Sequence, residues 1–221
     1  MKKTLSITDA VTMIPSGSTL MIGGFMGVGS PNLLIDELVR QAKNALTLIV
    51  NDTARPSVGI GKLIDAGLVE RLITSHIGTN PETQRQMIAE ELNVELVPQG
   101  SLAEKIRCGG HGLGGVLTPT GVGTLAAEGK QVINMDGRDY LLERPLKADF
   151  ALIKAQQCDY YGNLQYRLTA QNFNPLMALA ASTVFAEADE LLPAGCIPPD
   201  NVHTPGTLVD YIVKAEVSHG S

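Results

Sequence analysis

The fold is decided by residues 19–31, which read Thr19-Leu20-Met21-Ile22-Gly23-Gly24-Phe25-Met26-Gly27-Val28-Gly29-Ser30-Pro31. The apolar run at the start predicts a short buried strand, and the Ser-Pro pair at the end predicts the capped start of a helix. Such a junction lies at the carboxyl end of a parallel strand, which is where open α/β sheets bind ligands.

The same order of strand, polar turn and capped helix recurs on the C-terminal side of this junction. We expect strands at 19–22, 46–50, 69–75 and 94–97, and helices at 6–14, 31–41, around 62–64 and 82–91. This alternation predicts an α/β fold with an open, mainly parallel sheet and helices on both faces. The pattern loosens after residue 109, where we expect a hairpin turn at Asp136-Gly137, strands at 150–153 and 183–185, and a closing helix at 208–215. No linker divides the chain, so we expect one domain over residues 1–221.

Composition and charge exclude several classes of protein. The 221 residues are 44% hydrophobic and 18% charged, with only 4% aromatics, which predicts a folded chain with an aliphatic core. A net charge of −6 without any basic run argues against nonspecific nucleic-acid binding. Three cysteines without a CxxC spacing argue against a disulfide framework, and no stretch reaches membrane-spanning length. We therefore expect a soluble protein of the cytoplasm.

Four glycines within residues 23–29 make the junction a candidate binding turn. Glycines allow backbone N–H groups to approach a ligand, and a following helix start would add free donors and a positive dipole end. The spacing matches neither the dinucleotide-binding pattern nor a P-loop. The alternative is a tight strand-to-helix turn without a ligand, but four glycines exceed what a turn needs.

Other candidates have simpler interpretations. His76, after an apolar strand, is either a general base or a hydrogen-bonded structural histidine, and we favour the structural role. Cys108 and His111 lack an oxyanion motif, and the scattered His, Cys and Asp residues do not predict a metal site. The second glycine cluster, at 109–115, predicts a structured loop packed near a site. The amide-rich segment 171–175 either lines a polar site or braces two loops.

Taken together, these segments resemble the alpha subunits of family I (3-oxoacid) CoA-transferases. The resemblance covers nearly the whole chain and rests on residues 20–25 with Gly29 and Pro31, 51–54, 75–83, 97–100, 114–115, 118–124, 158–159, 162–164 and 172–174 with Pro175. The family usually has Asp or Asn where this chain has Ser16, a departure outside the glycine turn. The resemblance implies a three-layer α/β fold shared with sugar-phosphate isomerases.

The resemblance also implies a reaction and a site. It implies transfer of CoA between a short-chain acyl-CoA and a carboxylic acid of the acetate, butyrate or acetoacetate type, with CoA as a substrate and no other cofactor. The nucleophile would be a glutamate of a partner beta subunit in an alpha2beta2 heterotetramer, so no catalytic residue is expected in this chain. The only Glu-Gly pair here, Glu128-Gly129, predicts a helix end at the surface. The residues expected to bind CoA are Gly24, Phe25, Met26, Gly27, Val28, Gly29 and Ser30, and those expected to line the substrate site are Gln99, Gly114 and Gly115.

Two alternatives belong to other functional classes. The first is a CoA-binding or acyl-CoA-binding regulatory module without turnover. The second, based on fold likeness alone, is a sugar-phosphate isomerase or deaminase that works without a partner.

Overall fold

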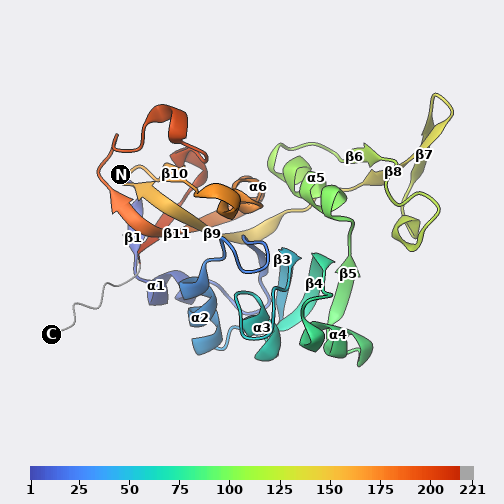
Figure 1. Cartoon of the computed structure of the whole chain (residues 1–221), viewed down its shortest axis with the longest axis horizontal. Helices are drawn as coiled ribbons and strands as arrows, with labels where there is room; N and C mark the ends of the chain where they lie inside the picture. The colour runs from blue at the N-terminus through green and yellow to red at the C-terminus, as the bar shows by residue number, and fades with distance from the viewer. Residues whose placement is uncertain (215–221) are drawn as a thin grey trace.

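One long, twisted sheet forms the body of the molecule (Figure 1). The computed structural model describes residues 1–214. Within this range the strand order is β1-β12-β11-β9-β2-β3-β4-β5, with β10 paired to β9. All of these pairs are parallel except β10 with β9. The strands are β1 (Lys3–Leu5), β2 (Thr19–Ile22), β3 (Leu46–Asp52), β4 (Val69–His76), β5 (Asn93–Leu96), β9 (Ala148–Asp159), β10 (Leu164–Gln165), β11 (Ala181–Leu192) and β12 (Tyr211–Lys214).

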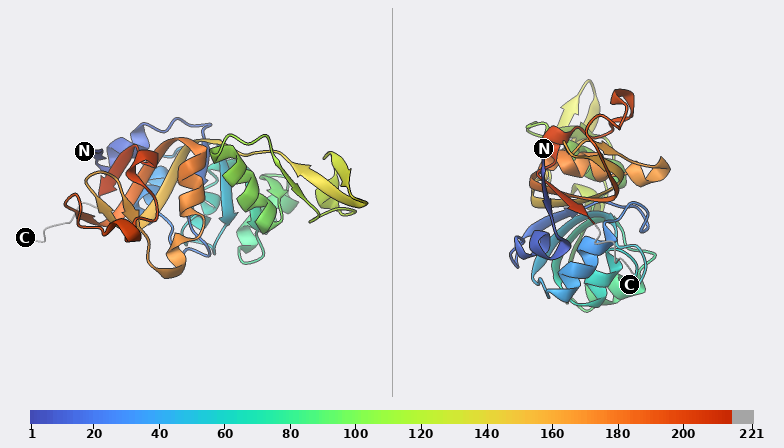
Figure 2. Two further views of the ribbon diagram at one scale, coloured as in Figure 1. Left: turned by 90° about the horizontal axis from the view of Figure 1, so that it is seen from above. Right: turned by 90° about the vertical axis from the view of Figure 1, so that its left-hand side faces the viewer.

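Helices cover both faces of this sheet, which confirms the expected fold class (Figures 1 and 2). On one face lie α1 (Ile7–Thr12), α2 (Asn32–Arg40), α3 (Gly61–Asp65) and α4 (Pro81–Ile88). On the other face lie α5 (Gln99–Gly110) and α6 (Asn174–Ala180). Successive strand residues serve the two faces in turn, as the twofold period of a strand requires: Leu20 belongs to one buried cluster and Met21 to the other.

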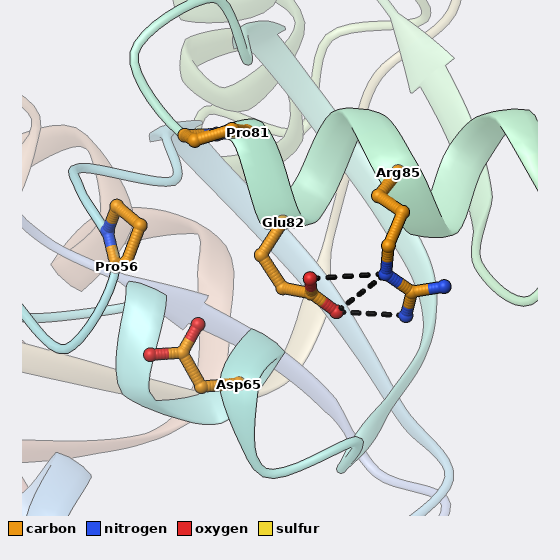
Figure 3. Close-up of a pocket in the computed structure, with 5 residues that line it drawn as sticks. All are labelled: Pro56, Asp65, Pro81, Glu82 and Arg85. Carbon is orange, nitrogen blue, oxygen red and sulfur yellow. Dashed lines mark hydrogen bonds and ion pairs between the residues drawn. The ribbon is translucent and has the colours of Figure 1, made fainter.

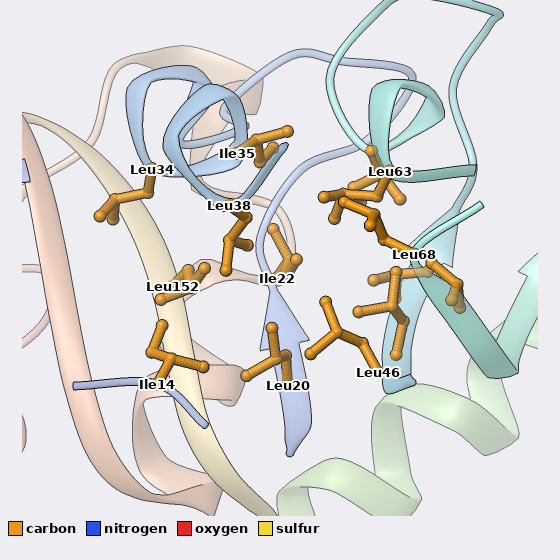
Figure 4. Packing of buried hydrophobic residues seen from close by; sticks show 14 of the residues in the cluster. Ile14, Leu20, Ile22, Leu34, Ile35, Leu38, Leu46, Leu63, Leu68 and Leu152 are labelled. Atoms are coloured by element: carbon orange, nitrogen blue, oxygen red, sulfur yellow. The ribbon is translucent and has the colours of Figure 1, made fainter. Parts of the chain in front are cut away.

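The two cores are almost entirely aliphatic, as the composition predicts. Figure 4 shows the cluster beneath α2 and α3, where leucine and isoleucine side chains fill the space between helices and sheet. Most of the large side chains that are fully buried are leucine or isoleucine, and Phe185 is the one aromatic among those of greatest volume within residues 1–214. Burial on both faces explains why four of the first five residues of β3, Leu46 to Val50, are apolar.

A smaller antiparallel sheet projects beyond the end of the body (Figures 1 and 2). It consists of β6 (Val116–Thr118), β8 (Arg138–Glu143) and β7 (Val132–Met135), in the order β6-β8-β7. We call residues 116–143 the arm. Asp136 and Gly137 join β7 to β8 with φ values of 52° and 78°, which confirms the predicted hairpin.

The predicted C-terminal helix is wrong. Residues 211–214 form β12, which pairs in parallel with β1 and β11, whereas residue 215 of the predicted range lies outside the described residues. The segment Tyr211-Ile212-Val213 is aromatic and β-branched, and its pairing with two strands outweighs the helical spacing of its apolar residues.

The helices α5 and α6 are not predicted by the sequence pattern. Two glycines at the C-terminal end of α5 suggested a loop, but each allows a close approach of the chain. A Cβ on Gly109 would lie 1.8 Å from the carbonyl oxygen of Leu146, and one on Gly110 would meet the side chain of Leu179. These glycines therefore permit tight packing of a helix. None of the helices in residues 1–214 is both long and apolar enough to span a membrane.

Candidate functional site

The carboxyl ends of β2, β3 and β4 meet at one edge of the sheet. Because β3 and β4 pair in parallel with Asp52 opposite His76, both strands end at the same level. β2 pairs with β3 and leads directly into the glycine turn. The structure thus brings the turn, the end of β3 and the end of β4 together, as expected for ligand sites in open α/β sheets.

The glycine turn has a tight hairpin at its tip. The N–H groups of Phe25 and Val28 each donate to the carbonyl oxygen of the other, at 3.0 and 2.9 Å. The central residues Met26 and Gly27 have φ values of 51° and 87°, the signs found in a type I′ turn. The tip exposes the apolar side chains of Phe25 and Val28, at 45% and 50%. Within residues 1–214 the N–H groups of Gly27 and Gly29 have no hydrogen-bond partner.

Residues 172–174, which follow the 3-10 turn Leu168–Gln171, form hydrogen bonds with the glycine turn. Of the two interpretations of the amide-rich segment 171–175, the structure favours the one in which it braces two loops. Asn172 accepts the N–H of Gly24 at 3.1 Å and donates to the carbonyl oxygen of Val28 at 3.0 Å. Asn174 donates to the carbonyl oxygen of Gly29 at 3.0 Å. The amides hold two loops together, and they do not line the cavity described below.

Close contacts of these loops account for several of the glycines. A Cβ on Gly23 would lie 1.8 Å from Oδ1 of Asn174, and one on Gly29 would lie 2.5 Å from the carbonyl oxygen of Ala170. A Cβ on Gly24 would meet the hydroxyl of Ser30 at 2.1 Å. Packing alone therefore requires three of the four glycines, and ligand contact is not needed to explain them.

The start of α2 is closed, contrary to the expectation of free donors there. The helix begins at Asn32 without a side-chain cap, so Ser30 is not its N-cap. Instead Oε2 of Glu187, from β11, accepts the N–H groups of Leu33 and Leu34 at 3.0 and 3.1 Å. Burial raises the pKa of Glu187, while Lys154, 3.1 Å away, and the two N–H groups oppose that rise. A carboxylate of the chain itself thus occupies the position where an anionic ligand would bind.

A cavity of about 390 Å³ opens beside the turn, between the ends of β3 and β4 and the start of α5. It is lined by Phe25, Met26, Asn51, Asp52, Ser75, His76 and Gln99. Nε2 of Gln99 donates to Oδ1 of Asn51 at 2.8 Å, and Nδ2 of Asn51 donates to Oδ2 of Asp52 at 2.6 Å. This polar wall faces the apolar side chain of Phe25, an arrangement that suits a small ligand with one polar and one apolar end.

The structure places the predicted site residues in two groups. Phe25, Met26 and Gln99 line the cavity, and the rest of residues 24–30 form the adjoining turn. Gly114 and Gly115 lie between α5 and the arm and do not line this cavity. His76 is exposed on the cavity wall, and its ring has no hydrogen bond within residues 1–214, in contrast to the favoured structural role.

Sequence reasoning did not assign site positions to Asn51, Asp52 and Ser75. A signal was available, because polar residues follow directly after the buried runs of two neighbouring parallel strands. At the carboxyl edge of a parallel sheet such residues lie side by side. No group of three or more His, Cys, Asp or Glu side chains in residues 1–214 is placed to hold a metal ion.

A second hollow, of about 560 Å³, lies beside α4 (Figure 3). The charged side chains in it are already engaged. Arg85 pairs with Glu82 at 2.8 Å and with Glu91 at 2.8 Å. The hydrogen bonds that Glu82 accepts from Arg85 and from Gln86 lower the pKa of Glu82 to about 2. Asp65 accepts the N–H of Ser57 at 2.7 Å. Its charged side chains are held mainly by one another and by Ser57, so we do not regard this hollow as a candidate site.

Comparison with known proteins agrees with the sequence and the fold. The family model described as "Coenzyme A transferase" matches residues 4–215. The acetate CoA-transferase subunit alpha of Escherichia coli K12 is 54% identical over 98% of this chain and 98% of its own. The acetoacetyl-CoA:acetate/butyrate CoA transferase alpha subunit of Clostridium acetobutylicum is 50% identical over 96% and 97%.

A solved structure shows the same fold in a longer chain. An acyl-CoA transferase apoenzyme from Escherichia coli O157:H7 superposes with a TM-score of 0.84 at 24% identity, over 97% of this chain and 47% of that one. This chain therefore spans about half the length of that protein. From the match along residues 4–215 and the near full-length identity to two of its members, the chain belongs to the coenzyme A transferase family.

Proposed function

We propose that this chain is the alpha subunit of an enzyme that moves CoA between a short-chain acyl-CoA and a carboxylic acid of the acetate, butyrate or acetoacetate type. The observation that carries this proposal is the 54% identity, over nearly the full length of both chains, to a protein named acetate CoA-transferase subunit alpha. The cavity of about 390 Å³ at the carboxyl edge of the sheet is of a size that suits a small acyl group.

CoA would contact the turn formed by residues 24–30. The free N–H groups of Gly27 and Gly29 are donors that a polar group of CoA can reach, and the exposed side chains of Phe25 and Val28 offer apolar contact to its methylene groups. Gln99 is the candidate for contact with the acyl group. Gly114 and Gly115 remain candidates only for a part of the site that the partner subunit completes.

The nucleophile would come from a partner beta subunit, in an alpha2beta2 assembly. Among residues 1–214, Asp52 is the one carboxylate that lines the cavity, and its oxygens already accept hydrogen bonds. A glutamate of the partner would attack the thioester carbonyl, form a mixed anhydride and release CoA thiolate. The thiolate would then attack the glutamyl carbonyl, which gives a glutamyl-CoA thioester and frees the first acid. The second acid reverses these steps, and two easier exchanges replace one difficult one.

CoA would act only as a substrate in this scheme, without a further cofactor. We also propose that residues 1–221 work as one domain in the cytoplasm. The three cysteines support a reducing compartment, since none of them forms a disulfide and two are buried.

The test is coexpression with a beta chain of the same family. The purified complex is assayed with acetyl-CoA, butyryl-CoA and acetoacetyl-CoA against the three acids, and then trapped with borohydride or hydroxylamine during turnover. We expect transfer activity and a label on a partner glutamate. A label on Glu128 or any other residue of this chain would overturn the assignment of the nucleophile. Binding of CoA without turnover in any mixture would favour the regulatory module, and activity of the chain alone on a sugar phosphate would favour the isomerase.

A further inference from the structure

The carboxyl group of Asp52 is buried and forms no ion pair within the described residues. The residue is 3% exposed. Neutral donors surround the carboxylate instead. Ala54 donates its N–H at 2.7 Å, Met26 donates its N–H at 2.9 Å, and Asn51 donates from Nδ2 at 2.6 Å. A buried carboxylate is tolerated only when its donors are held in place, so these groups form a rigid unit.

Two of these donors belong to residues in an unusual backbone conformation. Met26 and Ala54 both have a φ of 51°, in the left-handed region that non-glycine residues seldom adopt. Met26 lies in the glycine turn, and Ala54 lies in the loop after β3. Because both N–H groups point at the same carboxylate, Asp52 holds the turn against the end of β3.

The third donor gives the amide of Asn51 a single orientation. A carboxylate can only accept, so the Asn51 amide must direct Nδ2 towards Asp52 and Oδ1 towards the cavity side. There Oδ1 lies 2.8 Å from Nε2 of Gln99 and 3.2 Å from the hydroxyl of Ser75. Gln99 must therefore donate to Asn51, which leaves its Oε1 acceptor and one N–H available to a ligand.

We propose that Asp52 is a positioning residue, whose carboxylate fixes through Asn51 the way Gln99 presents its amide to the acyl substrate. The proposal rests on the proposed function, because that function places the acyl group in this cavity. Asp52 does not touch the substrate in this scheme; it sets which atoms of Gln99 do.

Asp52→Asn tests this effect. Oδ1 of the new amide can still accept the N–H groups of Ala54 and Met26, which lie 2.7 and 3.1 Å from Oδ1 of Asp52. Its Nδ2, however, would face Nδ2 of Asn51. The Asn51 amide must then flip, and Gln99 must turn its Oε1 to Asn51 and its NH₂ group to the cavity. The N–H of Met26 also lies 2.9 Å from Oδ2 of Asp52, the position that the new Nδ2 would take, so the hold on the turn weakens while the polarity offered to the substrate is reversed. A loss through the turn is the same in both backgrounds of the cycle below, whereas a loss through Gln99 is not.

The experiment uses the alpha–beta complex with four versions of this chain: wild type, Asp52→Asn, Gln99→Ala and the double variant. We expect Asp52→Asn to lower the kcat/KM of the wild-type complex for the short-chain acyl-CoA about tenfold or more. In the Gln99→Ala background, we expect the same substitution to lower kcat/KM by less than about twofold. Equal factors in both backgrounds would mean that Asp52 acts on the fold alone, and no loss in either would also overturn the proposal.

Asp65→Asn is the matched control. Asp65 also accepts the N–H of a left-handed residue, Ser57 with a φ of 59°, but lies outside the cavity. We expect its kcat/KM to stay within about twofold of wild type. If Asp52→Asn fails to fold, Asn51→Ala replaces it in the same cycle, because it interrupts the chain of amides and leaves the contacts of Asp52 with the turn.

Failure of the proposed function can be told apart from failure of this inference. If the wild-type complex transfers no CoA, the thermal midpoints of the same four complexes still report the coupling. We then expect Asp52→Asn to lower the midpoint less in the Gln99→Ala background than in wild type. Equal shifts in the two backgrounds would overturn the inference whatever the activity is.

Discussion

The body and the arm are both built from hydrogen-bonded strands, but the side chains on those strands have different surroundings. In β9 most residues are buried, because helices pack on both faces of the main sheet. In β6, β7 and β8 only Leu141 and Glu143 are buried. Buried apolar area is the main source of stability, and a small three-stranded sheet without a packed face is marginal by itself. The body therefore has a core, whereas the arm depends mainly on its strand pairing and its attachment to α5.

The attachment of the arm is itself polar. Glu143, 1% exposed, pairs with Lys130 at 2.6 Å and lies 3.6 Å from Nζ of Lys105, a residue of α5. Its second oxygen has no hydrogen bond. In the body, Glu187 is equally buried, but it accepts bonds from Lys154 and from two N–H groups of α2. A fully bonded carboxylate fixes its surroundings better than a partly bonded one.

The largest expected difference concerns local opening. We expect amide hydrogens of β9 to exchange at least about a thousandfold more slowly than those of β7, a difference of about 4 kcal/mol in opening free energy. Hydrogen exchange followed by mass spectrometry measures both segments in one sample. Equal protection of the two strands would show that arm and body open as one cooperative unit, and the contrast drawn above would fail.

A pair of leucine substitutions tests the source of stability. Leu152 of β9 is fully buried among the residues of the cluster beneath α2, and Leu125 of the arm is 84% exposed. We expect Leu152→Ala to lower the free energy of unfolding by about 3 kcal/mol, as removal of a core leucine does. We expect Leu125→Ala to change it by less than about 0.5 kcal/mol. Urea denaturation at one pH gives both values, and a large loss at Leu125 would reveal packing that the arm lacks in this structure.

The same contrast explains what the sequence could predict. The strands of the body within residues 19–97 have short apolar runs that alternate with polar turns and helices, so the succession of these elements along the chain could be predicted. The helix α5 could not, because the glycines that allow its close packing on Leu146 look like a loop in the sequence. The strand β12 has the apolar spacing of a helix in the sequence, and its pairing with β11 and with the distant β1 decides its conformation.

The candidate site was predicted only in part for a related reason. The glycine turn is local in sequence and could be found, but two of its four glycines, Gly23 and Gly29, serve contacts with residues 170–174, about 150 positions later. The closure of α2 by Glu187 is equally remote in sequence. Gln99 was found through the family resemblance, whereas its link to Asp52 through Asn51 depends on side-chain geometry that no spacing reveals.

Two turns of the same type provide a third test. Met26-Gly27 and Asp136-Gly137 both have two positive φ values, but only the first turn is clamped, by Asp52. An alanine at either glycine is strained by about 1–2 kcal/mol. We expect Gly137→Ala to speed exchange in β7 and β8 without moving the urea midpoint. We expect Gly27→Ala to raise the KM of the complex for acyl-CoA, because the added Cβ would lie 3.0 Å from Val58 and displace the tip. An unchanged KM would mean that the turn is structural only.

The smallest expected effect concerns acid stability and the surface of α2. A hydrogen bond from Arg40, against a smaller opposing effect of burial, and a further bond from Gln41 lower the pKa of Glu37 from 4.5 to about 2. Since the folded-state pKa lies below the unfolded one, this interaction contributes stability above pH 4.5 and loses it as the pH falls towards 2. We expect the urea midpoint of wild type to fall more steeply over this interval than that of Glu37→Gln. Arg40→Met removes the same interaction by deleting its donor, and it should reduce the pH dependence of the urea midpoint to the same extent.

The exchange protection of β9 should fall together with the stability of wild type as the pH is lowered. The protection of β7 should not, because the arm opens without unfolding the body. A parallel acid response in β7 would argue for one cooperative unit.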